Sequence, residues 1–232
     1  MKIAIMQPYF FPYLGYFQML NAVDKFVLLD DVNFIMRGYI NRNSILINGK
    51  AHLFSIPLEK PSQNKLIKDT KIKFVQKDRE NFLKTITLAY KKAPFYDDFF
   101  SIFKDIIENN DDDLTSYIKY SLEQVKNYLN LNTEILVSSQ IKKDNSLHAQ
   151  DRIIEINKQL GSTHYINTIG GQDLYNKNDF EKACIKLNFI KMLPVKYKQF
   201  KNEFVPNLSI IDVLMFNSKE EIKLLLEKNI LI

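Results

Sequence analysis

The sequence is poor in the residues that bind metals and form cross-links. It has one cysteine, Cys184, and three histidines, His52, His148 and His164. A single cysteine excludes an internal disulfide and a cysteine-based metal cluster. No two histidines have the spacing of metal ligands, and no His-Glu helical motif is present, so the pattern does not indicate a zinc enzyme. No metal site is expected.

Long apolar runs and flexible linkers are also missing. No apolar run approaches the ~20 residues that a membrane-spanning helix needs. The start of the chain passes from Met1-Lys2 directly into a short apolar segment that does not resemble a signal peptide. We therefore expect a cytoplasmic protein with no membrane span. No stretch rich in Gly, Ser or Pro divides the 232 residues, 46% of which are hydrophobic, so the sequence predicts one domain covering residues 1–232.

The net charge of +5 is unevenly distributed along the chain. Residues 60–92 contain ten Lys or Arg and three acidic residues, whereas residues 97–113 contain seven acidic residues and one Lys. The basic segment could contact a phosphate-bearing partner such as a nucleotide sugar, a lipid-linked sugar or RNA. The alternative is an ordinary solvated surface, because lysine-rich faces are common.

The first 20 residues predict a strand, a rigid turn and a helix. Residues 3–6 are apolar, Pro8 and Pro12 lie in the turn, and aromatic and aliphatic residues then recur at helical spacing. In open α/β sheets, ligands bind where a strand ends and the next helix begins, because the helix start offers free N–H groups. The residues expected to line this mouth are Gln7, Tyr9, Tyr13, Gly15 and Tyr16. The aromatic residues could instead belong to the core.

The next apolar run, residues 24–31 (DKFVLLDD), ends in two carboxylates. A continuous apolar run is typical of a strand buried on both faces of a parallel sheet. Such a sheet would place Asp30 and Asp31 beside the mouth of the first strand. The order of strand, helix and strand predicts a right-handed crossover and an α/β fold with a Rossmann-like, mostly parallel sheet flanked by helices.

Residues 32–57 combine polar side chains with a hairpin signal. The Asn48-Gly49 pair predicts a tight turn between strands at residues 44–48 and 51–56. Arg42 lies between two asparagines, where it could bind a phosphate or carboxylate through two parallel hydrogen bonds or could bind loop carbonyls. The other candidate binding residues of this segment are Arg37, Asn41 and Asn43.

Three amphipathic patterns predict consecutive helices, which form a helical insert at about residues 77–130. The chain then predicts a strand at 133–138, a helix at 149–160 and a strand at 165–169. That strand runs into two glycines, which allow positive φ and close approach of a ligand to the backbone, although paired glycines also occur in plain turns. The candidate binding residues of this second loop are Asn167, Gly170, Gly171 and Tyr175.

The remaining patterns indicate structural roles. Cys184 falls on the apolar stripe of a helix at about residues 180–187, which predicts a buried, inert thiol. Residues 189–195 predict the last strand. Ser209 with Asp212, and Ser218 with Glu221, have the spacing of capping boxes. Ser209 and Asp212 are also candidates for the site.

Several long and compositionally unusual motifs are spread from Met6 to about Asn217: MQPYFFPYLGYFQML, DKFVLLDDVNF, RGYINRN, YINTIGGQDLY and FVPNLSIIDVLM. Together they resemble the WbqC-like family of bacterial proteins over nearly the whole chain. The resemblance implies a place in gene clusters for O-antigen and other surface polysaccharides, and a glycine or other acyl transferase role.

The predicted function is a transferase of surface-polysaccharide biosynthesis that moves an acyl or aminoacyl group to a sugar amine or hydroxyl. Asp30, Asp31 and Arg42 are the predicted catalytic residues, with Asp31 as the preferred general base and Arg42 holding an anionic group. The expected partners are a nucleotide-linked or lipid-linked sugar and an activated acyl donor. Nucleic acid is expected only if the donor is an aminoacyl-tRNA, and no cofactor is identified.

Three other functions stay open. The chain could be a non-catalytic module that binds a sugar nucleotide. It could be an RNA-binding protein that uses its basic segment, with a steep salt dependence. It could also catalyse ATP-dependent nucleotidyl transfer, because a strand that runs into a Pro-containing turn and a Gly-centred helix start is similar to nucleotidyltransferases and class I synthetases. Those enzymes carry histidines where this chain has Leu14-Gly15-Tyr16, which puts contacts to a triphosphate in doubt.

Overall fold

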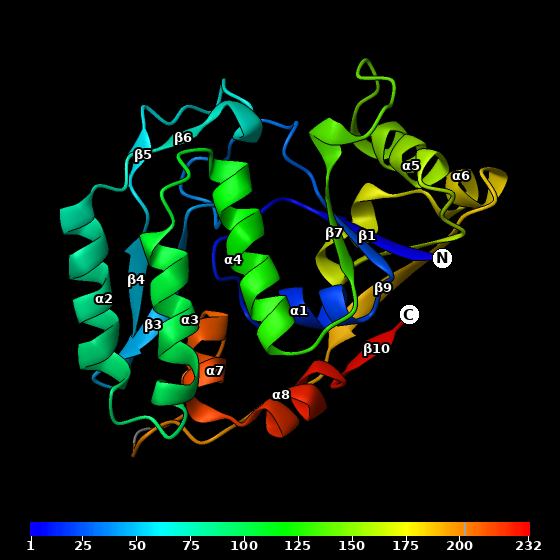
Figure 1. The fold of residues 1–232 in the computed structure, drawn as a ribbon. Coiled ribbons are helices and arrows are strands. Elements are labelled where there is room, and N and C mark those ends of the chain that lie inside the picture. The colour runs from blue at the N-terminus through cyan, green and yellow to red at the C-terminus, as the bar shows by residue number, and fades with distance from the viewer. Residues whose placement is uncertain (202) are drawn as a thin grey trace.

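A computed structural model describes residues 1–201 and 203–232 of the chain. Its centre is a six-stranded sheet in the order β10-β9-β8-β1-β2-β7, in which β10 is antiparallel to β9 and the other pairs are parallel (Figure 1). The predicted Rossmann-like, mostly parallel sheet is confirmed. Its strands are β1 (Lys2–Met6), β2 (Lys25–Leu28), β7 (Glu134–Val137), β8 (His164–Thr168), β9 (Lys186–Met192) and β10 (Asn229–Leu231).

Helices cover both faces of this sheet. Residues of α5 and α6 form a core with one face, whereas α1, α7, α8 and the three helices of the predicted insert share a larger core with the other face. The helices outside the insert are α1 (Leu14–Asn21), α5 (Ala149–Gln159), α6 (Lys177–Lys182), α7 (Ile210–Phe216) and α8 (Lys219–Leu226). Three short 3-10 helices are η1 (Ile67–Asp69), η2 (Ser138–Gln140) and η3 (Ile169–Leu174).

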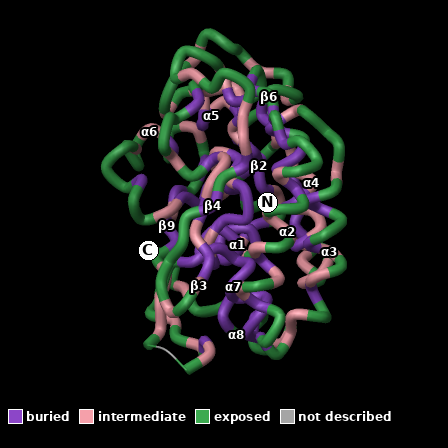
Figure 2. Tube along the Cα trace, turned by 90° about the vertical axis from the view of Figure 1, so that its left-hand side faces the viewer, coloured by how far each residue is buried: buried purple, intermediate pink, exposed green. Residues whose placement is uncertain are grey.

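Side chains along β2 alternate between these two cores. Phe26 and Leu28 pack in the larger core, while Val27 and Leu29 pack in the core under α5 and α6. Successive residues of an extended strand point to opposite faces of a sheet. The central strands are accordingly buried along most of their length (Figure 2).

The segment between β2 and β7 contains the predicted hairpin and helical insert. In the hairpin turn, Asn48 and Gly49 have φ values of +50° and +73°, which suits a tight two-residue turn between twisted strands. All three predicted helices of the insert are confirmed. The elements of this segment are β3 (Arg42–Ile47), β4 (Lys50–Ser55), β5 (Leu58–Glu59), β6 (Lys71–Ile72), α2 (Gln76–Tyr90), α3 (Tyr96–Glu108) and α4 (Leu114–Tyr128).

Two sequence predictions about residues 180–195 are wrong. Cys184 is exposed, because α6 ends at Lys182 and the chain turns through a positive φ of 59° at Cys184 before β9 begins. The strand predicted at residues 189–195 is not the last one. It corresponds to β9, and the C-terminus adds the short antiparallel strand β10 at the edge of the sheet.

A buried carboxylate ties α7 to the insert. Asp212 is 0% exposed and accepts hydrogen bonds from the hydroxyls of Tyr90 and Tyr197, at 2.9 and 2.7 Å, and from Nε2 of Gln199 at 2.7 Å. Burial raises the pKa of Asp212, while these three donors oppose the rise. The hydroxyl of Tyr90 also accepts a hydrogen bond from the amide of Leu46 on β3. One carboxylate therefore links α7, α2, β3 and the segment at residues 197–199.

The predicted capping boxes have different outcomes. Ser218 and Glu221 form the complete reciprocal box at the start of α8. Ser209 caps α7 by accepting the amide of Ile211, but Asp212 points into the core. The box predicted for Ser209 and Asp212 is therefore wrong for its second member.

Replacing Asp212 tests this network. Asp212→Ala is expected to lower the free energy of unfolding by about 3 kcal/mol, because three buried donors lose their acceptor. Asp212→Asn keeps one acceptor oxygen and is expected to cost less. Urea denaturation followed by circular dichroism measures both. Ser218→Ala, which removes an exposed cap worth about 1 kcal/mol, is the control. Equal losses in Asp212→Ala and Ser218→Ala would contradict the network's role.

Candidate functional site

The carboxyl ends of five parallel strands meet at one edge of the sheet. From β1 the chain proceeds through β2 to β7 on one side, and then crosses to β8 and β9 on the other side of β1. The point at which this order reverses lies between β1 and β8, and it is where open α/β sheets bind ligands. Gln7 follows β1 and Ile169 follows β8, so the two predicted ligand loops leave the sheet side by side.

Within the first loop, two predicted binding residues have packing roles. Tyr16 is 1% exposed, and its hydroxyl donates to the carbonyl of Gln7. A Cβ added to Gly15 would collide with Sδ of Met192 and the ring of Tyr13, so close packing requires glycine here. Tyr9 and Tyr13 are only partly buried, and the ring of Tyr9 lies 6.4 Å from that of exposed Tyr39. Gln7, Tyr9 and Tyr13 thus remain accessible at the mouth.

The backbone of the second loop does not use the conformational freedom that its two glycines allow. Gly170 and Gly171 lie in η3, and neither has a positive φ. A Cβ on Gly171 would meet Nδ2 of Asn167 at 2.7 Å, so the Asn167 side chain would have to move, whereas Gly170 is open. Asn167 is 5% exposed and its Oδ1 accepts the amide of Thr168. Tyr175 at the end of the loop is partly buried, with its ring against Tyr165.

The two carboxylates after β2 line cavities on opposite sides of the sheet. Asp30 follows the alternation of Phe26 and Leu28 and faces the insert, while Asp31 follows Val27 and Leu29 and faces α5. They therefore lie in different surroundings and do not form a joint site.

Asp30 is an almost fully buried carboxylate without a cationic partner in the described chain. It is 1% exposed, and its two oxygens accept the amide and the hydroxyl of Ser139 at 2.9 and 2.7 Å. Burial raises the pKa of Asp30, and the nearby charge of Asp31 adds to the rise, which exceeds the opposing effect of the Ser139 hydrogen bonds. A carboxylate of this kind is a stronger base than an exposed one.

Asp31 is the anion of a buried ion-pair network. Lys143, whose side chain is 1% exposed, places Nζ 2.7 Å from Oδ2 of Asp31, and Ser138 donates to Oδ1 at 2.8 Å. Arg152 donates to the carbonyl of Asp31 and has Nη1 4.0 Å from Oδ1. Burial by itself would raise the pKa of Asp31, but the hydrogen bonds from Lys143 and Ser138 and the two positive charges lower it. The lowered pKa makes Asp31 a weaker base than Asp30.

Three polar residues of the RGYINRN motif donate hydrogen bonds to backbone carbonyls. Nε of Arg42 donates to the carbonyl of Gly38, Nδ2 of Asn41 donates to that of Ile56, and Nδ2 of Asn43 donates to that of Phe11. Arg37 is exposed. Across residues 1–201 and 203–232, no hydrogen bond or ion pair joins Arg37 or Arg42 to Asp30 or Asp31, and the catalytic role of these residues stays a prediction.

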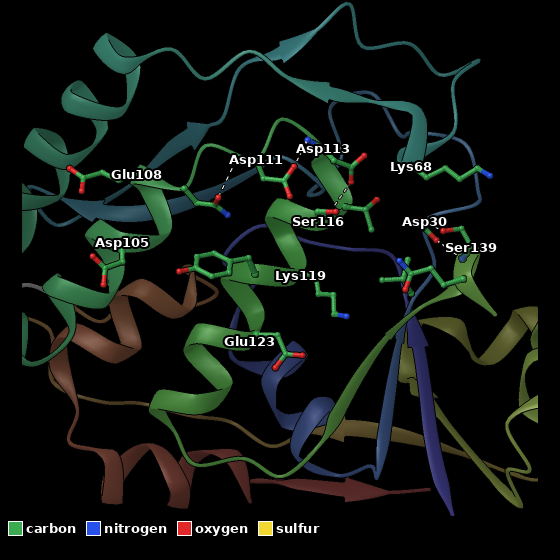
Figure 3. A pocket seen from close by; sticks show the side chains of 15 residues that line it. Asp30, Lys68, Asp105, Glu108, Asp111, Asp113, Ser116, Lys119, Glu123 and Ser139 are labelled. Atoms are coloured by element: carbon green, nitrogen blue, oxygen red, sulfur yellow. Dashed lines mark hydrogen bonds between the residues drawn. The ribbon is translucent and has the colours of Figure 1, made fainter.

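Asp30 and Asp31 line two different cavities at this edge of the sheet. One of about 900 Å³ lies between the carboxyl ends of β2 and β7 and helices α3 and α4, and Asp30, Ser139 and Lys119 line it (Figure 3). The other, of about 580 Å³, lies on the α5 side and is lined by Asp31 and Arg152 together with Tyr175 of the glycine loop. The structure thus brings Asp31 to the second loop and Asp30 to the insert.

A sequence model of the WbqC-like protein family matches residues 7–224. The chain belongs to this family. A protein of Mycobacterium tuberculosis described as uncharacterized, Rv1507c, is 23% identical over 228 residues, which cover 93% of each chain. No solved structure matches the chain.

The sequence patterns did not identify the residues that bond to Asp30 and Asp31 in this WbqC-like protein. Ser138 and Ser139 directly follow β7, which pairs with β2. Residues that follow neighbouring parallel strands lie at the same edge of a sheet, and this rule could have identified both serines. Lys143, Arg152 and Lys119 had no local signal, because they come from distant elements.

Metal binding and membrane insertion find no support in the described residues. In that part of the chain, no group of three or more His, Cys, Asp or Glu side chains could hold a metal ion. Likewise, none of the helices at residues 1–201 and 203–232 combines the length and the apolar character that a bilayer crossing requires.

The contrast between the two carboxylates predicts that their replacement destabilises this WbqC-like protein to different extents. At neutral pH, Asp31→Asn is expected to lower the free energy of unfolding by about 3 kcal/mol, because Lys143 is left as a buried unpaired charge. Asp30→Asn is expected to change it by less than about 1 kcal/mol, because the amide can still bond Ser139 without burying a charge.

The two effects also depend on pH in opposite directions. Since the native pKa of Asp31 is lowered, its stabilising effect is present above the ordinary pKa of about 3.9 and is lost as pH falls through the native pKa. Since that of Asp30 is raised, wild-type stability relative to Asp30→Asn is greatest below about pH 3.9 and declines as pH rises through the native pKa. Urea denaturation between pH 3 and 8 measures both differences. Similar losses in the two variants at pH 7.5 would refute the contrast.

Proposed function

We propose that this protein is a transferase that moves an acyl or aminoacyl group onto a nucleotide-linked or lipid-linked sugar during surface-polysaccharide biosynthesis. The observation that carries the proposal is Asp30, a buried carboxylate with a raised pKa that lines a cavity of about 900 Å³ at the carboxyl edge of the sheet. Buried titratable groups with perturbed pKa values in a cavity are typical of catalytic acids and bases. Membership of the WbqC-like family supports the type of substrate.

Asp30 is the proposed general base for the acceptor. The hydroxyl or amine of the sugar attacks the carbonyl carbon of the activated acyl donor, its proton passes to a carboxylate oxygen of Asp30, and the donor's leaving group departs with its electron pair. Ser139 fixes both oxygens of Asp30, which orients the base. Lys119 lines the same cavity and supplies a positive charge for the carbonyl oxygen that becomes negative. Asp31 holds the loop in place through Lys143 and Arg152.

The mouth between β1 and β8 is the proposed site of the nucleotide or phosphate part of a substrate. Gln7, Tyr9 and the open backbone at Gly170 lie at the point where the strand order reverses. Amide and aromatic side chains suit a polar sugar or a base. Holding two reactants in place can by itself remove several kcal/mol from a barrier.

A non-catalytic sugar-nucleotide binding module is the second candidate. It is favoured by the hydrogen bonds of Asp30, because both carboxylate oxygens already accept bonds from Ser139. A purified protein that binds a sugar nucleotide but transfers no group from any acyl donor would support this candidate.

Mass analysis of the surface polysaccharide tests the proposed transferase. Deleting the gene is expected to remove a discrete mass that corresponds to the transferred group. Complementation with Asp30→Asn is expected to leave that mass missing at a normal protein level, because loss of a general base typically costs about 10²- to 10⁴-fold in rate.

Glu181→Gln, an exposed change on α6, is the matched control and is expected to restore the mass. Full restoration by Asp30→Asn would refute the role of Asp30. An unchanged polysaccharide after gene deletion would refute the transferase itself.

A further inference from the structure

Two neighbouring serines at the end of β7 bond to the two neighbouring carboxylates that follow β2. Ser138 donates to Oδ1 of Asp31 at 2.8 Å, and Ser139 donates to Oδ2 of Asp30 at 2.7 Å. The serines and the carboxylates meet because β2 and β7 are parallel neighbours that end at the same edge of the sheet. The two pairs are alike in their bonding, but their surroundings differ.

Access to the cavity separates the two hydroxyls. Ser138 is 0% exposed and belongs to the buried network of Asp31. Ser139 is exposed, lies in the short helix η2 that follows β7, and lines the cavity of about 900 Å³ next to Asp30 (Figure 3). A substrate in this cavity therefore meets Ser139 and not Ser138.

The electrostatics of the bonded carboxylate also differ between the two pairs. Burial by itself would raise the pKa of Asp31, but the hydrogen bonds and positive charges of its partners lower it, so Asp31 takes up a proton poorly. Burial raises the pKa of Asp30, which makes no ion pair in the described chain. A carboxylate with a higher pKa takes the proton of a hydroxyl more readily.

The hydrogen bonds of Asp30 select the proton that it can take. Its Oδ1 accepts the amide of Ser139, which fixes the orientation of the carboxylate, and its Oδ2 accepts the hydroxyl of the same residue. An amide keeps its proton, whereas a hydroxyl can pass its proton to a neighbouring base while its oxygen attacks an electrophile. The 2.7 Å between Oγ and Oδ2 falls within the range of about 2.6–3.2 Å that is typical of a nucleophile and its base.

We propose that Ser139 is a catalytic nucleophile that carries the acyl group between the donor and the acceptor. The proposal rests on the proposed function and divides its transfer into two steps. In the first step, Oγ of Ser139 attacks the carbonyl carbon of the activated donor, and its proton passes to Oδ2 of Asp30 and then to the leaving group. The leaving group departs with the electron pair of its bond, and Ser139 holds the acyl group as an ester.

The second step restores the hydroxyl of Ser139. Acylation removes the hydrogen of Oγ, which frees Oδ2 of Asp30 to accept a bond from the acceptor's hydroxyl or amine. The acceptor attacks the carbonyl carbon of the ester, its proton passes to Asp30 and then to Oγ, and the ester bond breaks with its electron pair on Oγ. Asp30 thus remains the base for the acceptor. Lys119 lines the same cavity and stabilises the negative carbonyl oxygen in both steps.

Reaction of the purified full-length protein with p-nitrophenyl acetate, a small activated ester, tests the proposal. The wild type is expected to release a stoichiometric burst of p-nitrophenolate and to gain a single acetyl group, which mass spectrometry of its peptides locates on Ser139. Ser139→Ala and Asp30→Asn are both expected to react at least about 100-fold more slowly, because the first lacks the nucleophile and the second lacks the base.

Two controls separate a chemical role from a structural one. Asp30→Asn keeps an oxygen that can accept the hydroxyl of Ser139, so it removes the base while the bond remains. Urea denaturation followed by circular dichroism checks that both slow variants are folded. Ser101→Ala removes an exposed serine of α3 outside the cavity lining and is expected to react like the wild type.

Acetylation confined to lysines, or equal burst rates in the wild type and Ser139→Ala, would overturn the proposal. The polysaccharide analysis gives an independent result. A gene-dependent glycan mass that Ser139→Ala restores in full would refute the covalent step and leave the transferase standing. An acetylated Ser139 without any gene-dependent glycan mass would support the nucleophile and refute the transferase.

Discussion

The alternation of side chains along β2, which continues past the end of the strand at Leu28, is the constraint on which this site depends. It sends Asp30 and Asp31 to opposite faces of the sheet, one towards the insert and one towards α5. Two carboxylates that are adjacent in the chain thus meet different surroundings. One loses water without gaining a cation, whereas the other becomes the centre of an ion-pair network. Environment, rather than residue type, gives them different chemistry.

The network around Asp31 connects the ends of β2 and β7 with α5. Lys143 follows η2 and Arg152 lies on α5, so a single carboxylate fixes two loops and one helix at the carboxyl edge. Its geometry requires all partners, because removal of one leaves a buried charge. The rigid edge that results holds Ser139 against Asp30 on the other side of the sheet.

A second polar network, centred on Asp212, serves the insert. It joins α7 with α2 and the hairpin, while Asn43 and Ser209 both donate to the carbonyl of Phe11 in the first turn. Motifs far apart in the sequence, RGYINRN and FVPNLSIIDVLM, therefore bind the same N-terminal turn. Asn43 and Ser209 thus stabilise the first turn, whereas Tyr9, Tyr13 and the open Gly170 remain available at the mouth.

The sequence by itself determined the type of fold and the loops that carry the candidate residues. Apolar runs, helical periodicity and turn residues are local signals, and they predicted the parallel sheet, the hairpin, the three helices of the insert and the loops after β1, β2 and β8. Local signals were weaker at element ends, where Cys184 was placed on a helix that ends two residues earlier.

Only the tertiary structure decided which groups surround each candidate residue. Lys143 and Arg152 reach Asp31, and Ser139 reaches Asp30, from distant parts of the chain. The pKa of a carboxyl depends on its burial and on the distances to nearby charges. Neither quantity can be read from the sequence alone. The choice of Asp30 over Asp31 as the proposed base therefore required the folded chain.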